Sequence, residues 1–229
     1  MVSSDQRLAR MIDHTNLRPE ATEEQIIRLC QEAREFDFAA VVVNAAYVEL
    51  ASTQVAGSSV KVACVVGFPL GATLSSVKRF ETREALTLGA REIDMVLNLG
   101  ALKSGKHDFV RGEIQSVAEV THERDGLLKV ILETGLLTED EKRLACELSV
   151  QAGADFVKTS TGFLGGGATV GDVRRMRQIV GPSIGVKASG GIRTAADAKA
   201  MLEAGANRIG TSSGVKIIEE LREALPTTR

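Results

Sequence analysis

Short apolar runs alternate with longer amphipathic stretches eight times along this chain of 229 residues. Each apolar run predicts a buried strand, and each stretch that follows it shows a helical pattern. The runs cover residues 10–15, 39–44, 60–68, 92–98, 127–134, 154–160, 183–189 and 206–212. Eight strand–helix units of about 25–30 residues fit a closed (β/α)8 TIM barrel better than an open doubly wound sheet, which is the alternative. We therefore expect a single α/β barrel domain over residues 1–229.

Four threonines mark expected helix starts, because each precedes a helical pattern and has a polar partner three residues later. The pairs are Thr22 with Gln25, Thr138 with Glu141, Thr169 with Asp172, and Thr194 with Asp197. Gly89, Gly153 and Gly205 stand where helices should end, each followed by an alanine and the next expected strand. These signals place the helices between the strands.

The charge pattern favours a small-molecule partner. The chain has 28 Lys and Arg residues against 30 Asp and Glu residues, a net charge of −2 and a pI near 6.0. Because both signs are interleaved, a nucleic-acid-binding or membrane-binding surface is not expected. The amino-terminal segment is charged and lacks a long apolar stretch, so we expect a cytoplasmic protein. Dimers are the commonest assembly of such proteins, which makes a homodimer the expected state.

Neither the cysteines nor the histidines indicate a metal site. Cys30, Cys64 and Cys146 are odd in number, lack CxxC spacing and lie in apolar stretches, which is typical of reduced core cysteines. The three histidines show no HxxH or HExxH spacing. No G-x-G-x-x-G turn follows the first expected strand, so a dinucleotide is not expected either. The sequence predicts no metal and no cofactor.

Two lysines stand where apolar strands end. Lys158 closes ADFVK and Lys187 closes IGVK, and a glycine-rich turn comes after each. A second ammonium about 4 Å away, at an effective dielectric constant of ~20, contributes about 4 kcal/mol. Lowering a lysine pKa from ~10.4 to about 7 requires roughly 4.6 kcal/mol, so modest desolvation would supply the remainder. The pair predicts one neutral lysine, an amine nucleophile, with two solvated surface lysines as the alternative.

Asp94 is the carboxylate expected beside these lysines. In EIDMVLN it lies between Ile93 and Met95, so the alternation of strand side chains directs it into the barrel. A buried carboxylate needs a partner, and we expect the two lysines to be the available cations. Asp94 would then carry protons in a reaction, and the alternative is a structural ion pair that holds a lysine in place.

Glycine-rich turns follow the last two expected strands. The segments SGGIRT and GTSSGV occupy positions where many barrels bind phosphate through backbone N–H groups. TGFLGGGAT, after the sixth strand, is a further candidate loop at the mouth. The predicted substrate and phosphate contacts are Thr161, Gly162, Ser189, Gly190, Gly191, Ser212, Ser213 and Asp13. Ordinary tight turns are the alternative for these loops.

A neutral lysine, a second lysine, a carboxylate and a phosphate site together indicate amine attack on a carbonyl, as in class I aldolases. The motifs IDHTNL, EIDMVLNLGAL, FVKTSTGF and VKASGGIRT, in this order, resemble the deoxyribose-phosphate aldolase family over essentially the whole chain. The resemblance implies reversible cleavage of 2-deoxy-D-ribose 5-phosphate to acetaldehyde and D-glyceraldehyde 3-phosphate, in deoxynucleoside breakdown. It also implies that Lys158 forms the Schiff base, that Lys187 lowers its pKa and takes part in proton transfer, and that Asp94 is the proton donor and acceptor.

One segment departs from the family pattern. The family commonly has Cys-Val-Asn-Pro where this chain has Val42, Val43, Asn44 and Ala45, which removes a cysteine from the mouth. Three other functions fit parts of the pattern, namely another Schiff-base aldolase or transaldolase, a phosphosugar isomerase, and a non-catalytic phosphate-metabolite-binding protein. The second lysine argues against the first of these. Borohydride would lock only an aldolase-type enzyme covalently to its carbonyl substrate.

Overall fold

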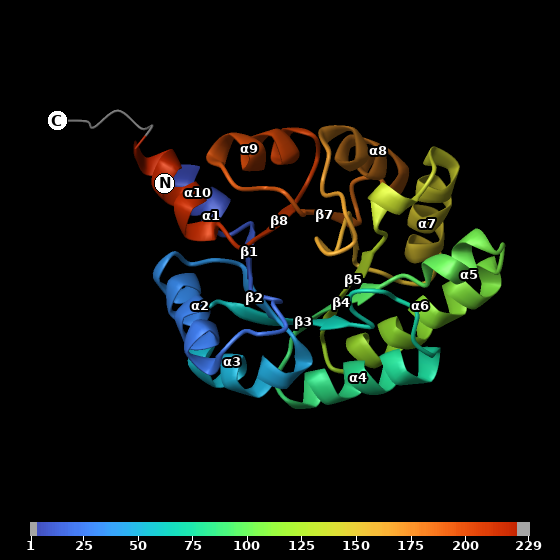
Figure 1. Cartoon of the computed structure of the whole chain (residues 1–229), viewed down its shortest axis with the longest axis horizontal. Coiled ribbons are helices and arrows are strands. Elements are labelled where there is room, and N and C mark those ends of the chain that lie inside the picture. Colours follow the sequence, from blue (N-terminus) through green and yellow to red (C-terminus); the bar gives the residue numbers. More distant parts are fainter. Residues whose placement is uncertain (1–3, 224–229) are drawn as a thin grey trace.

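The computed structural model describes residues 4–223, and eight parallel strands close into a barrel in the order β1 to β8 (Figure 1). The strands are β1 Ile12–Thr15, β2 Ala40–Val43, β3 Lys61–Val66, β4 Glu92–Val96, β5 Leu127–Ile131, β6 Phe156–Lys158, β7 Gly185–Ser189 and β8 Arg208–Thr211. Strand β1 pairs in parallel with β8, which closes the sheet. The predicted (β/α)8 barrel is confirmed, and the open sheet is wrong. The extension of the domain over all of residues 1–229 stays a prediction.

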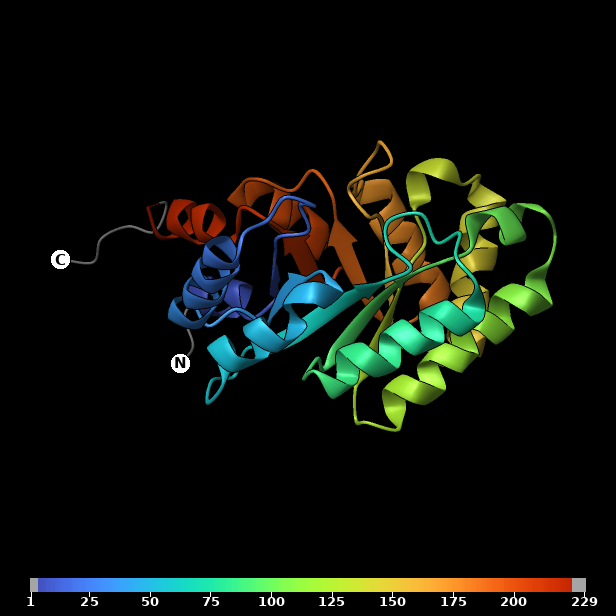
Figure 2. The ribbon, with the colours of Figure 1, turned by 60° about the horizontal axis from the view of Figure 1, so that its bottom comes forward.

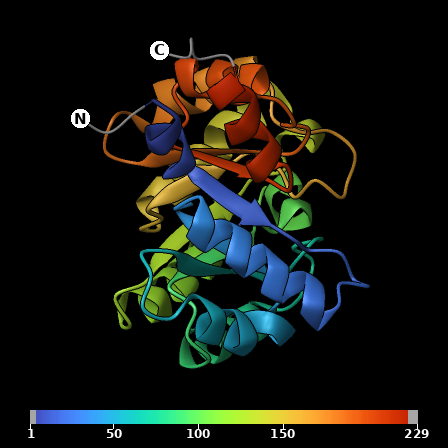
Figure 3. The same cartoon turned by 90° about the vertical axis from the view of Figure 1, so that its left-hand side faces the viewer.

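Helices form a ring outside the strands (Figure 1). They are α1 Ser4–Ala9, α2 Glu23–Glu35, α3 Val48–Val55, α4 Ser75–Thr87, α5 Leu99–Lys103, α6 His107–His122, α7 Glu139–Gln151, α8 Val170–Val180, α9 Ala195–Glu203 and α10 Gly214–Glu223, with 3-10 turns η1 Ala45–Tyr47 and η2 Thr134–Leu136. Helix α1 packs beside α10, where Arg222 Nε lies 3.1 Å from Asp5 Oδ2 (Figure 3). Within residues 4–223, no helix has the length and apolar character needed to cross a membrane.

The predicted helix starts have the expected capping geometry. Thr22, Thr138 and Thr194 each form a reciprocal capping box with the residue three positions later. Thr169 accepts from the backbone N–H of Asp172 at 3.0 Å. Gly89, Gly153 and Gly205 follow their helices with φ between 86° and 112°, a region that favours glycine.

Both faces of the strands are buried, as expected for a parallel sheet covered by helices. In β4, Ile93 and Met95 belong to the large apolar core of the protein, whereas the side chain of Asp94 pairs with lysines of β5, β6 and β7. A second, smaller apolar cluster consists of Leu17, Ala40, Val42, Ala63 and Val65. The alternation that predicted Asp94 to face inward is therefore present in the structure.

The loops that follow the strands gather at one end of the barrel. In Figure 2 the arrows of β7 and β8 point toward the end from which the loops 67–74 and 159–169 project. Because all eight strands are parallel, every strand brings its carboxyl end to this side. The polar residues predicted from strand ends thus lie at the entrance to the barrel.

Candidate active site

Lys158, the last residue of β6, is buried inside the barrel with 4% of its side chain exposed. Its Nζ lies 2.8 Å from Oδ2 of Asp94. Lys187 stands beside it in register on β7, and its Nζ lies 2.8 Å from the same carboxylate oxygen. One carboxylate oxygen therefore accepts from both predicted lysines, and all three predicted catalytic residues meet in one cluster.

The pKa of Lys158 is lowered to about 8. Burial is the largest cause, because a charged ammonium loses its hydration there. Asp94 opposes this effect, while Lys187 and then Lys129 add to it by repulsion. The predicted direction of the Lys158 pKa shift agrees with the structure. The predicted order of its causes was wrong, because desolvation is the largest cause and the second ammonium makes a smaller contribution.

Asp94 stays ionised although it is fully buried. Burial alone would raise its pKa, but Lys129, Lys158 and Lys187 together hold the pKa well below the usual value. Lys129 of β5 contacts the other oxygen, Oδ1, at 2.7 Å. The expectation that only two lysines serve Asp94 was therefore wrong, because a third lysine fixes the opposite side of the carboxylate.

Four further charged side chains extend this cluster below Lys158 and Lys187, namely the buried Lys129, Glu92 and Asp13 and the partly buried Arg208. Glu92 Oε2 lies 2.6 Å from Lys129 Nζ, and Glu92 Oε1 lies 2.6 Å from Arg208 Nη2. Arg208 also contacts Asp13, whose Oδ2 is 2.5 Å from Lys187 Nζ. Sequence reasoning missed Lys129, Glu92 and Arg208, although the alternation rule that located Asp94 applies to each of them.

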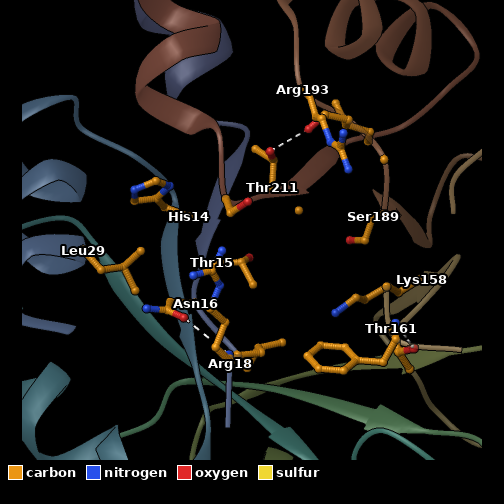
Figure 4. A pocket seen from close by; sticks show the side chains of 18 of the residues that line it. His14, Thr15, Asn16, Arg18, Leu29, Lys158, Thr161, Ser189, Arg193 and Thr211 are labelled. Atoms are coloured by element: carbon orange, nitrogen blue, oxygen red, sulfur yellow. Dashed lines mark hydrogen bonds between the residues drawn. The ribbon is translucent and has the colours of Figure 1, made fainter. Parts of the chain in front are cut away.

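A cavity of about 610 Å3 opens above Lys158. Of the residues predicted to contact substrate or phosphate, six line it: Thr161, Gly162, Ser189, Gly190, Gly191 and Ser212. Figure 4 shows the side chain of Lys158 pointing into the cavity, with Ser189 and Thr211 on the walls. The residues predicted from the ends of β6, β7 and β8 therefore line one cavity.

Two predicted substrate contacts do not line the cavity. Asp13 is fully buried beneath it, paired with Lys187 and Arg208. Ser213 lies just outside the lining, and its backbone N–H donates to Thr211 Oγ1 at 2.9 Å. Lys187 and Asp94 likewise lie below the lining, so they reach the cavity through Lys158.

Sequence reasoning also missed part of the cavity wall. Arg193, within the predicted phosphate loop SGGIRT, and Arg18, from the loop after β1, both line the cavity and supply cations to it. His14, set aside for lack of metal-binding spacing, lines it as well and lies 2.7 Å from Glu32 Oε2 through Nε2. An arginine within a phosphate-type loop was a usable signal for Arg193. Arg18 had no comparable signal.

Close backbone packing shapes the loops after β6 and β7. Gly190 has φ +93°, and a Cβ at this position would lie 2.9 Å from Cα of Gly167. Gly191 has φ +82° but open space around its missing side chain, and it lines the cavity. Glycine at 190 thus permits loop-to-loop contact, and glycine at 191 leaves room for a ligand.

Glu133 holds the loop after β6 in place. Its Oε2 accepts from the backbone N–H of Thr161 at 3.1 Å and from the Thr161 hydroxyl at 2.5 Å. Glu133 itself has φ +55°, a left-handed conformation that is uncommon outside glycine. This contact fixes the backbone three residues beyond Lys158.

Comparisons with known proteins agree with this geometry. The curated deoxyribose-phosphate aldolase of Thermococcus gammatolerans is 59% identical over 226 residues, covering 98% of this chain and 100% of that protein. A structure described as a putative deoxyribose-phosphate aldolase from Coccidioides immitis is 44% identical with a TM-score of 0.93, covering 97% of this chain and 88% of that one. The tetrameric deoxyribose phosphate aldolase of Aeropyrum pernix is 38% identical with a TM-score of 0.91, covering 97% and 94%.

The sequence also matches the family described as DeoC/LacD family aldolase over residues 7–220, from α1 to α10. This match includes all eight strands and every charged residue of the barrel interior named above. The chain therefore belongs to the DeoC/LacD family of aldolases.

Proposed function

We propose that this protein is an aldolase that reversibly cleaves 2-deoxy-D-ribose 5-phosphate to acetaldehyde and D-glyceraldehyde 3-phosphate through a Schiff base on Lys158. The observation that carries the proposal is a buried lysine with a pKa lowered to about 8 at the floor of a cavity. The names of the relatives supply the sugar phosphate. No metal or cofactor takes part in the proposed steps.

The first step is attack of the neutral Lys158 amine on C1 of the open-chain sugar. Loss of water from the carbinolamine gives a protonated imine, which withdraws electrons from the neighbouring carbon. At pH 7 about one lysine in ten is neutral if the pKa is about 8, against fewer than one in 1,000 for an unperturbed lysine. The lowered pKa thus raises the supply of nucleophile by more than 100-fold.

The second step breaks the bond between C2 and C3. The C3 hydroxyl loses its proton, C3 becomes the aldehyde of glyceraldehyde 3-phosphate, and the bonding electrons form an enamine on the lysine-bound fragment. A proton is then added at C2, and hydrolysis of the imine releases acetaldehyde. The hydrolysis consumes one water molecule, which balances the one lost when the imine formed. Asp94 and Lys187, whose Oδ2 and Nζ atoms lie 2.8 Å apart, are the proposed carriers of these protons.

The phosphate is proposed to lie against the loops after β7 and β8. Gly190, Gly191 and Ser212 line the cavity beside Arg193, and Ser212 precedes the start of α10 by two residues. Backbone N–H groups at such a position and an arginine fork both suit a phosphate dianion. Ser213 and Asp13 stay predicted contacts, the former through its hydroxyl and the latter through Lys187.

The test is reductive trapping with acetaldehyde and borohydride, followed by peptide mass spectrometry. We expect one added ethyl group per chain, located on Lys158, and release of acetaldehyde from deoxyribose 5-phosphate by the untreated enzyme. Lys61→Met, which removes a lysine from the opposite end of the barrel, is the matched control and should trap normally. Absence of an adduct in the wild type, or its location on Lys187, would overturn the proposal.

The setting of the activity follows from the substrate. We propose a role in the breakdown of deoxynucleosides, in a cytoplasmic protein, because the substrate is a phosphorylated deoxysugar. The homodimer stays a prediction as well, and the Aeropyrum pernix relative is described as a tetramer. Size-exclusion chromatography with light scattering would determine the assembly of this chain.

A further inference from the structure

Six charged side chains form a closed ring across the barrel interior. In order they are Lys129, Glu92, Arg208, Asp13, Lys187 and Asp94, with Asp94 returning to Lys129. Five of these contacts lie between 2.5 Å, for Lys187 Nζ to Asp13 Oδ2, and 2.8 Å, for Lys187 Nζ to Asp94 Oδ2, and the sixth joins Arg208 to Asp13. Positive and negative groups alternate all the way round, so each member has an opposite charge on both sides.

The ring is buried from solvent. Lys129, Asp13, Lys187 and Asp94 have fully buried side chains, and Glu92 and Arg208 are 6% and 14% exposed. An additional contact of 3.9 Å joins Lys129 Nζ to Asp13 Oδ2 across the middle. Little water is available to screen a change of charge here, so each ring charge acts on its neighbours over several ångströms.

The ring is electrically balanced, and Lys158 is the surplus cation. Three cations, Lys129, Lys187 and Arg208, offset the three carboxylates of Glu92, Asp13 and Asp94. Lys158 contacts the ring only through Asp94 Oδ2, an oxygen already bound by Lys187. A charged Lys158 therefore adds an uncompensated positive charge to a buried and neutral assembly.

We propose that this ring is the positioning device that selects Lys158 as the neutral amine, with Lys129, Glu92 and Arg208 as positioning residues that act through Asp94, Asp13 and Lys187. The inference deepens the proposed aldolase function and rests on it. Lys129 fixes Oδ1 of Asp94, so that Oδ2 faces Lys158 and Lys187 together. Glu92 and Arg208 hold Lys129 and Asp13 from below.

The charged groups that act on Lys158 come from three other strands of the barrel. They are Asp94 of β4, Lys129 of β5 and Lys187 of β7, and the first favours the charged amine while the two lysines oppose it. Changing the ring charge by one unit at about 10 Å, with an effective dielectric constant of ~20, moves the titration of Lys158 by about one pH unit. The sign of that shift follows the sign of the charge change.

Opposite charge changes give the decisive experiment. Glu92→Gln leaves the ring with one extra positive charge, so the pH midpoint for acetaldehyde labelling of Lys158 should move about one unit toward acid. Arg208→Gln leaves one extra negative charge, so the midpoint should move about one unit toward alkali. The probe is acetaldehyde with cyanoborohydride, and the fraction of labelled Lys158 is followed by mass spectrometry from pH 5 to pH 10.

Further variants separate charge from damage to the fold. The double variant Glu92→Gln/Arg208→Gln keeps the ring neutral, so its midpoint should return to the wild-type value. If one single variant does not fold, Asp13→Asn repeats the gain of positive charge and Lys129→Met repeats the loss. Arg175→Gln, which removes a surface partner of Glu139, is the matched control and should leave the midpoint unchanged.

Midpoints that stay at the wild-type value, or that move in the same direction in both charge classes, would overturn the ring proposal. A merely structural role would lower the amount of folded protein without moving the midpoint in opposite directions. Failure of the proposed aldolase function would give a different result. If that function is wrong, Lys158 of the wild type would remain unlabelled at every pH.

Discussion

The two sides of the barrel interior have opposite chemistry. Facing inward, β2 and β3 carry Ala40, Val42, Ala63 and Val65, which pack with Leu17 in a small apolar cluster. The strands β4 to β8 and β1 carry the charge ring and Lys158 instead. The apolar side gains its stability from burial alone, whereas each charged group on the other side needs partners.

This difference explains where the proposed chemistry lies. An ammonium is destabilised most where water is excluded, and burial is the largest cause of the lowered pKa of Lys158. On the charged side, Lys129 and Lys187 each have two carboxylate partners at 2.8 Å or less, while Lys158 shares a single carboxylate oxygen with Lys187. Burial and the sharing of one carboxylate thus act together on Lys158, whereas the apolar side carries no charge.

The largest expected effect comes from removing the surplus cation. Lys158→Met should reduce cleavage of deoxyribose 5-phosphate by at least about 10⁴-fold, because the covalent step is lost. An aldehyde-release assay measures this loss, and circular dichroism should show that the barrel is retained. Residual activity within about 100-fold of the wild type would contradict the assignment of the nucleophile.

The same variant should be more stable than the wild type at pH 7. Because the folded pKa of Lys158 is lowered from 10.5 to about 8, its destabilising effect is fully present below about pH 8 and disappears as the pH rises to 10.5. The gain in unfolding free energy should be about 1–3 kcal/mol at pH 7 and shrink toward pH 10. Urea unfolding at pH 7 and at pH 10 measures this gain. An unfolding free energy that falls by the same amount at both pH values would contradict the buried surplus charge.

Asp94→Asn tests the carboxylate that joins the two lysines. We expect kcat to fall by about 10²–10⁴-fold, the usual size of a general acid–base contribution. Formation of the Lys158 adduct should remain measurable, because the amine is still present. Exchange of the acetaldehyde methyl protons with solvent, followed by NMR, isolates the proton step. Exchange at the wild-type rate would make Asp94 a structural residue only.

Gly191→Val tests the loop that is proposed to hold phosphate. The side chain would enter open space in the cavity at a φ of +82° and block approach of an anion to the backbone. We expect kcat/KM for deoxyribose 5-phosphate to fall by about 10–100-fold, with a much smaller change for unphosphorylated deoxyribose. Gly57→Val is the matched control, since Gly57 has φ +75° and open space but does not line the cavity.

The smallest effect on catalysis is expected on the apolar side. Val42→Ala removes two buried methyl groups from β2 and should cost about 1–3 kcal/mol of unfolding free energy. The activity and its pH midpoint should stay close to the wild type, because no charge changes. A shift of the midpoint by one unit would mean that the two sides of the interior are not separate in function.

The sequence predicted the elements that depend on local pattern. Eight apolar runs became eight strands because both faces of each strand are buried. Lys158, Lys187 and Asp94 were located because a charged residue within or at the end of an apolar run stands out, and alternation decides its direction. Threonine caps and helix-ending glycines were found for the same reason, since their signals lie within a few residues.

The ring was beyond local pattern because its members come from five strands. Lys129 lies between Leu128 and Val130, which alternation could have directed inward, yet its partners Glu92 and Asp94 are set by the register of β4 and β5. The contact between Arg208 and Asp13 depends on closure of β8 against β1. Such pairings follow from the closed barrel. Reasoning from the sequence alone therefore gave the charge of Lys187 as the main cause of the lowered Lys158 pKa, and burial as the second cause.

The central claim is that the pKa of Lys158 is lowered to about 8, and NMR of lysine carrying 13C at Cε measures it directly. One resonance, missing from the spectrum of Lys158→Met, should titrate near pH 8. The buried Lys129, whose pKa is raised by Asp94 and Glu92 against the effect of burial, should stay charged throughout. If the Lys158 resonance instead titrated near 10.5, like a solvated lysine, the account of this site would be contradicted.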